Sequence, residues 1–199
     1  PDLNLYFKFI NTGIIDKFTN TWGIEEMTYV KEKYLYPVVN KEKLKELYPR
    51  RYEQAIMPKL ITTGIRYFEV FGDFNGEYLS AKSTEIITSK GKIKIETILP
   101  ILNSNVVFFF IREAYGNVSM GGGITFSPDN LCNIPIPELE EKDIEKLNKL
   151  TEKYSHDFDE ESQDELDNYI YELYNLTNDD IKVIEDFKNE VRRKKRWVI

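Results

Sequence analysis

Two short segments of this 199-residue chain have the residue types of a ligand-contacting loop. Lys82-Ser83-Thr84 offers a cation and two hydroxyl groups in succession, which is the chemistry that anchors a phosphate. Residues 119–123 read Ser-Met-Gly-Gly-Gly, and three successive glycines allow the backbone to lie very close to a partner surface. The structural alternatives are the exposed end of an edge strand for the first segment and a tight turn for the second.

Signals of ordered structure follow the glycines. Ser127-Pro128 predicts a short capped turn, and residues 134–137, Ile-Pro-Ile-Pro, predict an extended exit into a new helix. A loop held between ordered elements is a common place for ligand contact, so we treat residues 119–123 as a candidate binding loop.

Basic residues of the first part of the chain are further candidates for phosphate contacts. They fall on or near predicted strands and loops: Arg50, Arg51, Lys59, Arg66, Lys82, Lys90, Lys92, Lys94 and Arg112. The net charge of −7 argues against nucleic acid at first sight. However, residues 1–136 hold 16 Lys and Arg against 15 Asp and Glu, whereas residues 137–199 hold 11 against 19. The acidity belongs to the C-terminal part, and the first part can present a basic face.

No catalytic constellation is visible in the sequence. The lone His156 lies in an acidic stretch without a Cys or His partner for zinc, which indicates a solvated surface residue. Residues 157–161, Asp-Phe-Asp-Glu-Glu, fail as an EF-hand loop because Ser162 and Asn168 stand where Gly and Glu are needed. We interpret them as a solvated helix start, and we expect no catalytic residue, metal ligand or cofactor in this chain.

Composition indicates a folded chain, with 41% hydrophobic and 14% aromatic residues. No apolar stretch reaches the roughly 18 residues of a membrane span. Since no signal peptide is evident and the single Cys132 has no internal disulfide partner, we expect the cytoplasm and no membrane partner. The chain begins at Pro1 and is strand-like from Leu3, so we expect a piece of a longer polypeptide.

The hydrophobic pattern predicts an α/β (α+β) fold. We expect a mixed, sheet-containing domain over residues 1–137 and a helical segment over residues 138–199. The predicted elements are strands and loops over 3–36, a helix over 41–48, two β-rich runs over 59–71 and 77–88 that form a hairpin around residues 72–76, a buried helix over 96–113, and helices over 138–154, 163–174 and 179–196. Thr177 and Asp180 have the spacing of an N-cap and its N3 partner.

Four segments, in this order, carry a resemblance to a known family. They are residues 9–18 (Phe-Ile-Asn-Thr-Gly-Ile-Ile-Asp-Lys-Phe) with Trp22-Gly23, the region 59–88 with Ala81-Lys82-Ser83-Thr84, Leu102-Asn103-Ser104 ahead of an aromatic helix, and residues 121–137. Together they resemble the TaqI-like C-terminal specificity domain. This domain is the target recognition module of adenine-N6 DNA methyltransferases and fused restriction–modification enzymes, and it is related to the specificity subunits of multi-subunit systems. Residues 170–177 are similar to the tail of many fused enzymes, although Asn175 stands where glycine is common.

The resemblance implies a module that recognises double-stranded DNA by sequence and positions an adenine-N6 methyltransferase, and in some enzymes a nuclease, on the target. The implied partners are double-stranded DNA and the methyltransferase domain of a parent chain. S-adenosylmethionine would bind to that domain, because this sequence lacks the Asn-Pro-Pro-Tyr motif and a glycine-rich cofactor motif. Expected phosphate contacts come from Lys59, Arg66, Lys82, Ser83 and Thr84, and expected approaches to base edges from Asn11, Thr12, Lys17, Ser119, Met120, Gly121, Gly122 and Gly123.

Two other functions fit the sequence. A protein–protein interaction or scaffold module would act through the acidic helices 138–196 and would bind a partner without any effect of DNA. A standalone metal-dependent hydrolase would use the acids of residues 157–161, and added metal would then shift the melting temperature.

Overall fold

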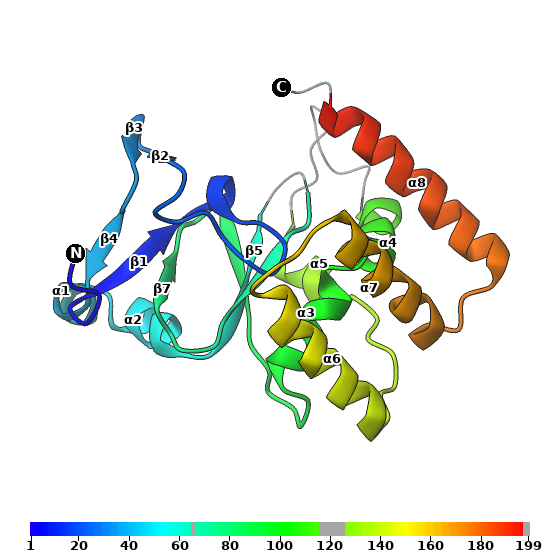
Figure 1. Ribbon diagram of the computed structural model, residues 1–199. Coiled ribbons are helices and arrows are strands. Elements are labelled where there is room, and N and C mark those ends of the chain that lie inside the picture. Colours follow the sequence, from blue (N-terminus) through cyan, green and yellow to red (C-terminus); the bar gives the residue numbers. More distant parts are fainter. Residues whose placement is uncertain (65–66, 116–125, 197–199) are drawn as a thin grey trace.

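The computed structural model describes residues 1–64, 67–115 and 126–196. Figure 1 shows small sheets gathered in the N-terminal half and helices in the C-terminal half. The described ranges contain three small sheets together with the helices α1–α8. The α/β class predicted from the sequence is therefore confirmed.

The first sheet has the strand order β4-β1-β7. Its strands are β1 (Tyr6–Ile10), β4 (Val38–Asn40) and β7 (Tyr78–Ser80). β4 runs antiparallel to β1 and β7 runs parallel to it, so Lys8 lies opposite both Val38 and Tyr78. Two helices, α1 (Lys41–Leu47) and α2 (Pro49–Ile56), lie beside this sheet and share a small apolar core with it. α2 was not predicted, and its proline occupies the first helical turn, where a missing N–H costs nothing.

The second sheet has the order β6-β5-β8, and it corrects the predicted hairpin. Its strands are β5 (Lys59–Thr63), β6 (Val70–Asp73) and β8 (Thr84–Ile87), with β5 antiparallel to both neighbours. A hairpin around residues 72–76 is wrong, because after this turn the chain enters β7 of the first sheet and only then returns as β8. The turn itself is present: Gly76 has a φ of 66°, and the Asp73 carboxylate accepts hydrogen bonds from the backbone N–H of Glu77 (2.9 Å) and Tyr78 (3.0 Å).

The helix predicted over residues 96–113 is two helices, α3 (Ile95–Leu102) and α4 (Asn105–Tyr115), bent by 70°. Asn103 lies at the break with a fully buried side chain. Its Oδ1 accepts a hydrogen bond from the N–H of Val70 (3.0 Å), and its Nδ2 donates to the carbonyl of Val70 (2.8 Å). This pairing with β6 interrupts a continuous apolar helix that the local spacing alone favours.

Four helices complete the chain. They are α5 (Pro128–Cys132), α6 (Glu141–Tyr154), α7 (Glu160–Leu173) and α8 (Asn178–Arg196). The Ser127 hydroxyl accepts a hydrogen bond from the N–H of Asn130 (3.3 Å), which confirms the predicted capped turn. The three long C-terminal helices are also confirmed, with α7 beginning three residues earlier than predicted.

One hydrophobic core crosses the predicted boundary at Pro137. The Phe18 ring, from the N-terminal part, contacts the rings of Tyr154 (5.3 Å between centroids) and Phe158 (4.7 Å). Leu147 of α6 and Leu166 of α7 are fully buried in the same core. The helical segment therefore packs on the preceding domain.

The N-terminus of α8 has the predicted capping contacts. The N–H of Thr177 donates to the Asp180 carboxylate (2.9 Å), and the N–H of Asp180 donates to the Thr177 hydroxyl (3.3 Å). We expect Thr177→Ala to lower the free energy of unfolding by about 1 kcal/mol, because an orphan N–H of the first turn loses its acceptor. Thr177→Asn, which retains a capping oxygen, should change it much less. Urea denaturation of both variants checks this, and equal losses would contradict the capping role.

Within the described ranges, no single helix combines the length and apolar character needed to cross a membrane. Among the residues that the structure describes, α3 and α4 taken together reach that length, as a sharply bent pair. Most of their apolar side chains are buried in the shared core.

Candidate nucleic-acid interface

Four residues far apart in the sequence meet where several loops converge. The Thr12 hydroxyl donates to the carbonyl of Ser83 and accepts from the N–H of Gly64 (3.3 Å). The N–H of Gly64 also donates to the carbonyl of Ser83 (3.0 Å), and the N–H of Phe126 donates to the carbonyl of Gly64 (2.9 Å). We call Thr12, Gly64, Ser83 and Phe126 the loop junction. It joins the Asn-Thr-Gly motif, the Lys-Ser-Thr motif and Phe126, which lies three residues after the last of the three glycines.

Gly64 is required at this junction by space. A Cβ built on it would lie 2.4 Å from the carbonyl oxygen of Ser83 and 2.9 Å from its carbonyl carbon. Any side chain would therefore separate the two backbone segments. Phe126 holds the other side of Gly64, since its ring is buried and packs edge-on against Phe68 at 5.1 Å. The junction is thus a fixed part of the fold.

Asn11 uses both ends of its amide inside the protein. Its Oδ1 accepts from the N–H of Gly13 (2.9 Å) at the start of the 3-10 helix Thr12–Ile14, and its Nδ2 donates to the carbonyl of Thr28 (2.8 Å). Asn11 and Thr12 therefore position loops, and their side chains are engaged with protein atoms rather than free for a base edge.

The Lys82-Ser83-Thr84 motif divides between surface and interior. Lys82 and Ser83 are exposed, and within the described part of the chain no hydrogen bond or ion pair of the Lys82 ammonium is present. Thr84 is buried, and its hydroxyl donates to the carbonyl of Ala81 (2.6 Å). The expected phosphate contact from Thr84 is therefore wrong, whereas Lys82 and Ser83 are accessible to a phosphate.

The expected phosphate contact from Lys59 is also wrong. Lys59 is fully buried, where its ammonium forms an ion pair with Asp73 and donates to the carbonyl of Ala55 (2.6 Å). Burial lowers the pKa of Lys59, and the Asp73 carboxylate opposes that shift. The strand register explains the pair, because Lys59 lies directly opposite Asp73 in the β5–β6 ladder. A lysine is rarely buried without such a partner, and the sequence does not reveal the register.

Lys17 donates into the protein as well. Its ammonium donates to the carbonyl of Asn103 (2.8 Å) at the α3–α4 break and to Oε1 of Gln163 (2.6 Å) in α7. These contacts connect the N-terminal segment to the helices, which is a structural role in place of the expected base contact. The other expected contact residues, Arg66, Ser119, Met120, Gly121, Gly122 and Gly123, lie outside the described residues.

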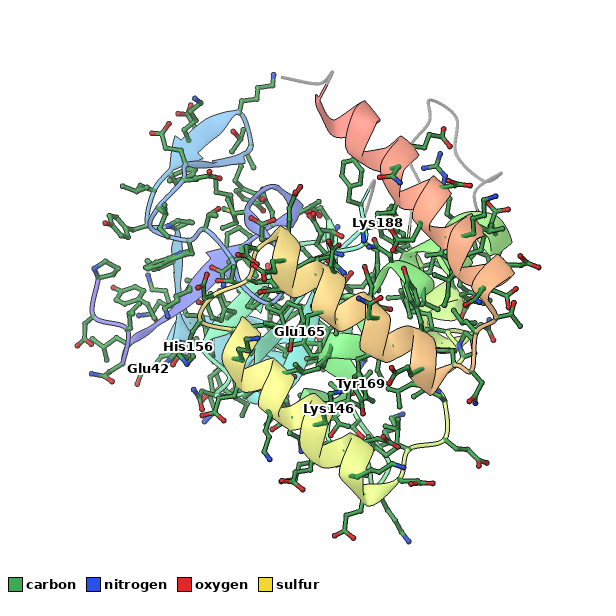
Figure 2. All side chains as sticks on the ribbon, turned by 45° about the vertical axis from the view of Figure 1, so that its right-hand side comes forward. Glu42, Lys146, His156, Glu165, Tyr169 and Lys188 are labelled. Carbon is green, nitrogen blue, oxygen red and sulfur yellow. The ribbon has the colours of Figure 1, made fainter. Side chains whose placement is uncertain are left out.

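A buried polar network continues from Lys17, and the sequence analysis missed it. Asp167 accepts from the N–H of Asn105 (2.8 Å), which starts α4, and from Nε2 of Gln163 (3.0 Å). Lys188 approaches Asp167 at 3.6 Å and donates to Asp164 (2.7 Å), and Figure 2 shows it on the side of α8 that faces α7. Burial raises the pKa of Asp167, while the hydrogen bonds from Asn105 and the charges of Lys17 and Lys188 act in the opposite direction.

A cavity of about 400 Å³ lies beside this network. Its lining includes Lys17, Phe158, Gln163 and Lys188. Both lysines already donate to oxygens of the protein, so their charges are satisfied internally. The cavity is therefore a weaker candidate for binding than the loop junction.

The acidic segment 157–161 starts a helix, as the sequence analysis interpreted it. Asp159 accepts a hydrogen bond from the N–H of Ser162 (2.8 Å) and so caps α7, and this bond lowers the pKa of Asp159. His156 is exposed, as predicted. In the described ranges no three His, Cys, Asp or Glu side chains are grouped closely enough to hold a metal ion.

A scan against protein-family models and a search of curated proteins found no significant match to this chain. The resemblance to target recognition domains therefore rests on the quoted motifs.

Proposed function

We propose that this chain recognises double-stranded DNA and positions an S-adenosylmethionine-dependent adenine-N6 methyltransferase on its target. The observation that carries the proposal is the loop junction. Ser83 belongs to a motif singled out by its chemistry and Thr12 to a motif singled out by the family resemblance, and the two meet although 70 residues separate them in the chain. Such convergence of polar loops on a rigid scaffold is typical of a binding surface.

Lys82 supplies the charge that this surface needs. It is exposed next to Ser83, and Lys90, Lys92 and Lys94 are exposed along the segment that follows β8. Phosphate contacts of this kind fix the position of a protein on DNA, while neighbouring backbone and side chains read the base edges. The excess of acidic residues belongs to the helices beyond Pro137, which is a different part of the chain from the one that carries these lysines.

The scaffold alternative receives less support from the packing. The apolar sides of α6 and α7 contribute Leu147, Leu150, Leu166 and Ile170 to the protein's own core. Their remaining surface is charged, and exposed charges alone bind a protein partner weakly. The methyltransferase chemistry and its cofactor would belong to a neighbouring domain, with this chain supplying the target site.

Selection from a randomised duplex pool tests the proposal. The chain is incubated with the pool at about 50 mM and about 200 mM salt, and the retained DNA is sequenced. We expect a short enriched motif. If DNA is retained without enrichment of any motif and is lost at the higher salt, sequence recognition needs the methyltransferase domain as well. If no DNA is retained at low salt, the proposal is contradicted.

Lys82→Ala gives a quantitative prediction for the same assay. Loss of one phosphate contact should weaken binding to all sequences alike and reduce the slope of log affinity against log salt by about one. Lys149→Ala on α6 is the matched control, since Lys149 is an exposed lysine of the acidic helices. Equal slopes for Lys82→Ala and Lys149→Ala would place the DNA contact elsewhere.

A further inference from the structure

The β2–β3 hairpin stands apart from the other sheets. β2 (Met27–Tyr29) and β3 (Glu32–Tyr34) pair only with each other, antiparallel, with Thr28 opposite Lys33. Figure 1 shows the pair projecting from the N-terminal half of the molecule. A two-stranded hairpin of this kind is only marginally stable by itself, so it needs contacts with the rest of the protein to stay folded.

The tip of the hairpin has a costly conformation. Its two-residue turn consists of Val30 (φ 50°) and Lys31 (φ 69°), both in the left-handed region. Asn-Gly is the favoured sequence for such a turn, and a β-branched residue there is rare and strained. Val30 is also 77% exposed, so no packing against the protein compensates for the strain. Strain kept at an exposed position is a feature of functional sites.

Exposed apolar side chains occur along the hairpin and the segments on either side of it. They come from the hairpin and its stem and comprise Ile24, Tyr29, Val30, Tyr34, Leu35 and Tyr36. Single exposed apolar residues are ordinary, but a group on one projecting element marks a contact surface.

The hairpin is fixed by Asn11, the residue before Thr12 of the loop junction, and by Phe9. Nδ2 of Asn11 donates to the carbonyl of Thr28, and the rings of Phe9 and Tyr29 meet edge-on at 5.0 Å. On the other strand, the N–H of Gly23 donates to the carbonyl of Leu35 (3.1 Å). β2 is therefore held in place up to the residue before the turn, while Val30 and Lys31 of the turn itself stay exposed, as expected for a contact element on a scaffold.

We propose that the tip of the β2–β3 hairpin enters a groove of DNA, where Val30 presses against a base step and Lys31 contacts a phosphate. This inference rests on the proposed function and assigns the element that inserts. A two-stranded ribbon fits the major groove, and apolar side chains act as wedges between base steps in the minor groove. A two-residue tip is much narrower than the roughly 800 Å² that each partner buries in a protein–protein interface. Lys31 is the charged member of the two-residue turn, and its sign is complementary to the DNA backbone, while the exposed Glu32 and Lys33 that follow it cancel in charge.

The double variant Val30→Asn/Lys31→Gly separates function from stability. It installs the sequence that this turn favours, so the melting temperature should be unchanged or higher. DNA affinity should fall about tenfold or more, because the wedge and one phosphate contact are lost together. The probe is the retained duplex from the randomised pool, or an unselected pool duplex at low salt if no motif is enriched. Fluorescence of 2-aminopurine in that duplex should rise with the wild-type chain and not with the variant, since a wedge unstacks bases.

Val183→Asn is the matched control, since Val183 is an exposed valine of α8, and it should leave affinity unchanged. If Lys82→Ala weakens binding but the hairpin variant binds and unstacks DNA like the wild type, the proposed function stands and this inference is overturned in favour of a protein contact at the tip. If the wild-type chain binds no DNA, the two fail together. Loss of affinity at a preserved melting temperature supports insertion of the tip.

Discussion

Asp73→Ala is expected to lower the free energy of unfolding by about 3–5 kcal/mol at neutral pH. The substitution leaves the Lys59 ammonium in the interior with only backbone carbonyls around it, of which Ala55 (2.6 Å) and Met57 (3.3 Å) accept its hydrogen bonds. It also leaves the N–H groups of Glu77 and Tyr78 without their acceptor in the turn after β6. Chemical denaturation followed by circular dichroism measures the loss.

The loss should depend on pH with a definite sign. Burial already lowers the pKa of Lys59, and removal of Asp73 removes the charge that opposes this shift. Between the lowered folded-state pKa and the unfolded value of about 10.4, the unfolded chain binds more protons than the folded one. The free energy of unfolding of Asp73→Ala should therefore rise with pH in this window, and a series of denaturation measurements up to about pH 10 follows the rise.

Two controls isolate the effect of burial. Glu145→Ala breaks an ion pair with Lys149 of similar length (2.6 Å) in which both side chains are mostly exposed, and it should hardly change stability. Lys59→Met/Asp73→Asn removes both charges and should recover part of the loss, because no unpaired charge remains in the interior. Additive losses in the double variant, or equal effects of Asp73→Ala and Glu145→Ala, would show that the pair is not coupled by burial.

Asn103→Ala is expected to cost about 2–4 kcal/mol. The N–H of Val70 loses its acceptor inside the core, for which an unsatisfied buried donor costs about 1–3 kcal/mol, and a small cavity adds about 1 kcal/mol. The carbonyl of Val70 suffers less, because the N–H of Phe18 also donates to it (2.8 Å). Thermal and urea unfolding of the variant give the value.

Asn133→Ala provides the comparison for Asn103→Ala. Asn133 is an exposed asparagine whose Nδ2 donates to the carbonyl of Asp129 (2.9 Å), so water can replace its contact. Asn103→Asp keeps the shape but places a carboxylate oxygen against the carbonyl of Val70, and it should be at least as damaging as the alanine variant. If Asn103→Ala and Asn133→Ala have similar free energies of unfolding, the pairing of Asn103 with Val70 does not stabilise the α3–α4 break.

The local signals in this sequence predict local structure well. Thr177 with Asp180 caps α8, Ser127 caps α5, and Gly76 adopts the positive φ of the predicted turn. Each of these depends on residues within three or four positions of one another, where the energetics of caps and turns dominate. Helices α6 to α8 follow from apolar spacing because each has one apolar side and one charged side.

Pairings over long distances in the chain were not predictable in the same way. The runs around residues 72–76 alternate like a hairpin, yet β6 pairs with β5 and β7 pairs with β1. Because the strand register is not visible in the sequence, Lys59 was expected to contact a phosphate at the surface. In the structure, Asp73 of β6 lies opposite Lys59 and is its counter-ion. Asn103 interrupts a helical pattern because its partner, Val70, lies on a strand of another part of the chain. Tertiary contacts decide these cases and override local preference.

The candidate site shows the same division. The resemblance drew attention to Thr12 and residue chemistry to Ser83, and the structure brings the two into contact, although the Thr12 hydroxyl bonds to the protein itself. Residue chemistry did not identify the β2–β3 hairpin. Its turn is formed by Val30 and Lys31, which are not the residue types that favour a two-residue turn, so the sequence carries no turn signal at this position.

The contacts of Phe18 have a consequence for synthesis on the ribosome. Its ring rests against Tyr154 and Phe158, and its backbone N–H is held by Val70, so most of the chain must emerge before residues near the N-terminus acquire their final packing. Similarly, β1 can form its parallel pairing with β7 only after Tyr78 has been translated. Closure of such long loops slows folding, so Phe18 completes its packing only after Phe158 has been translated, whereas β1 can pair with β4 and β7 earlier.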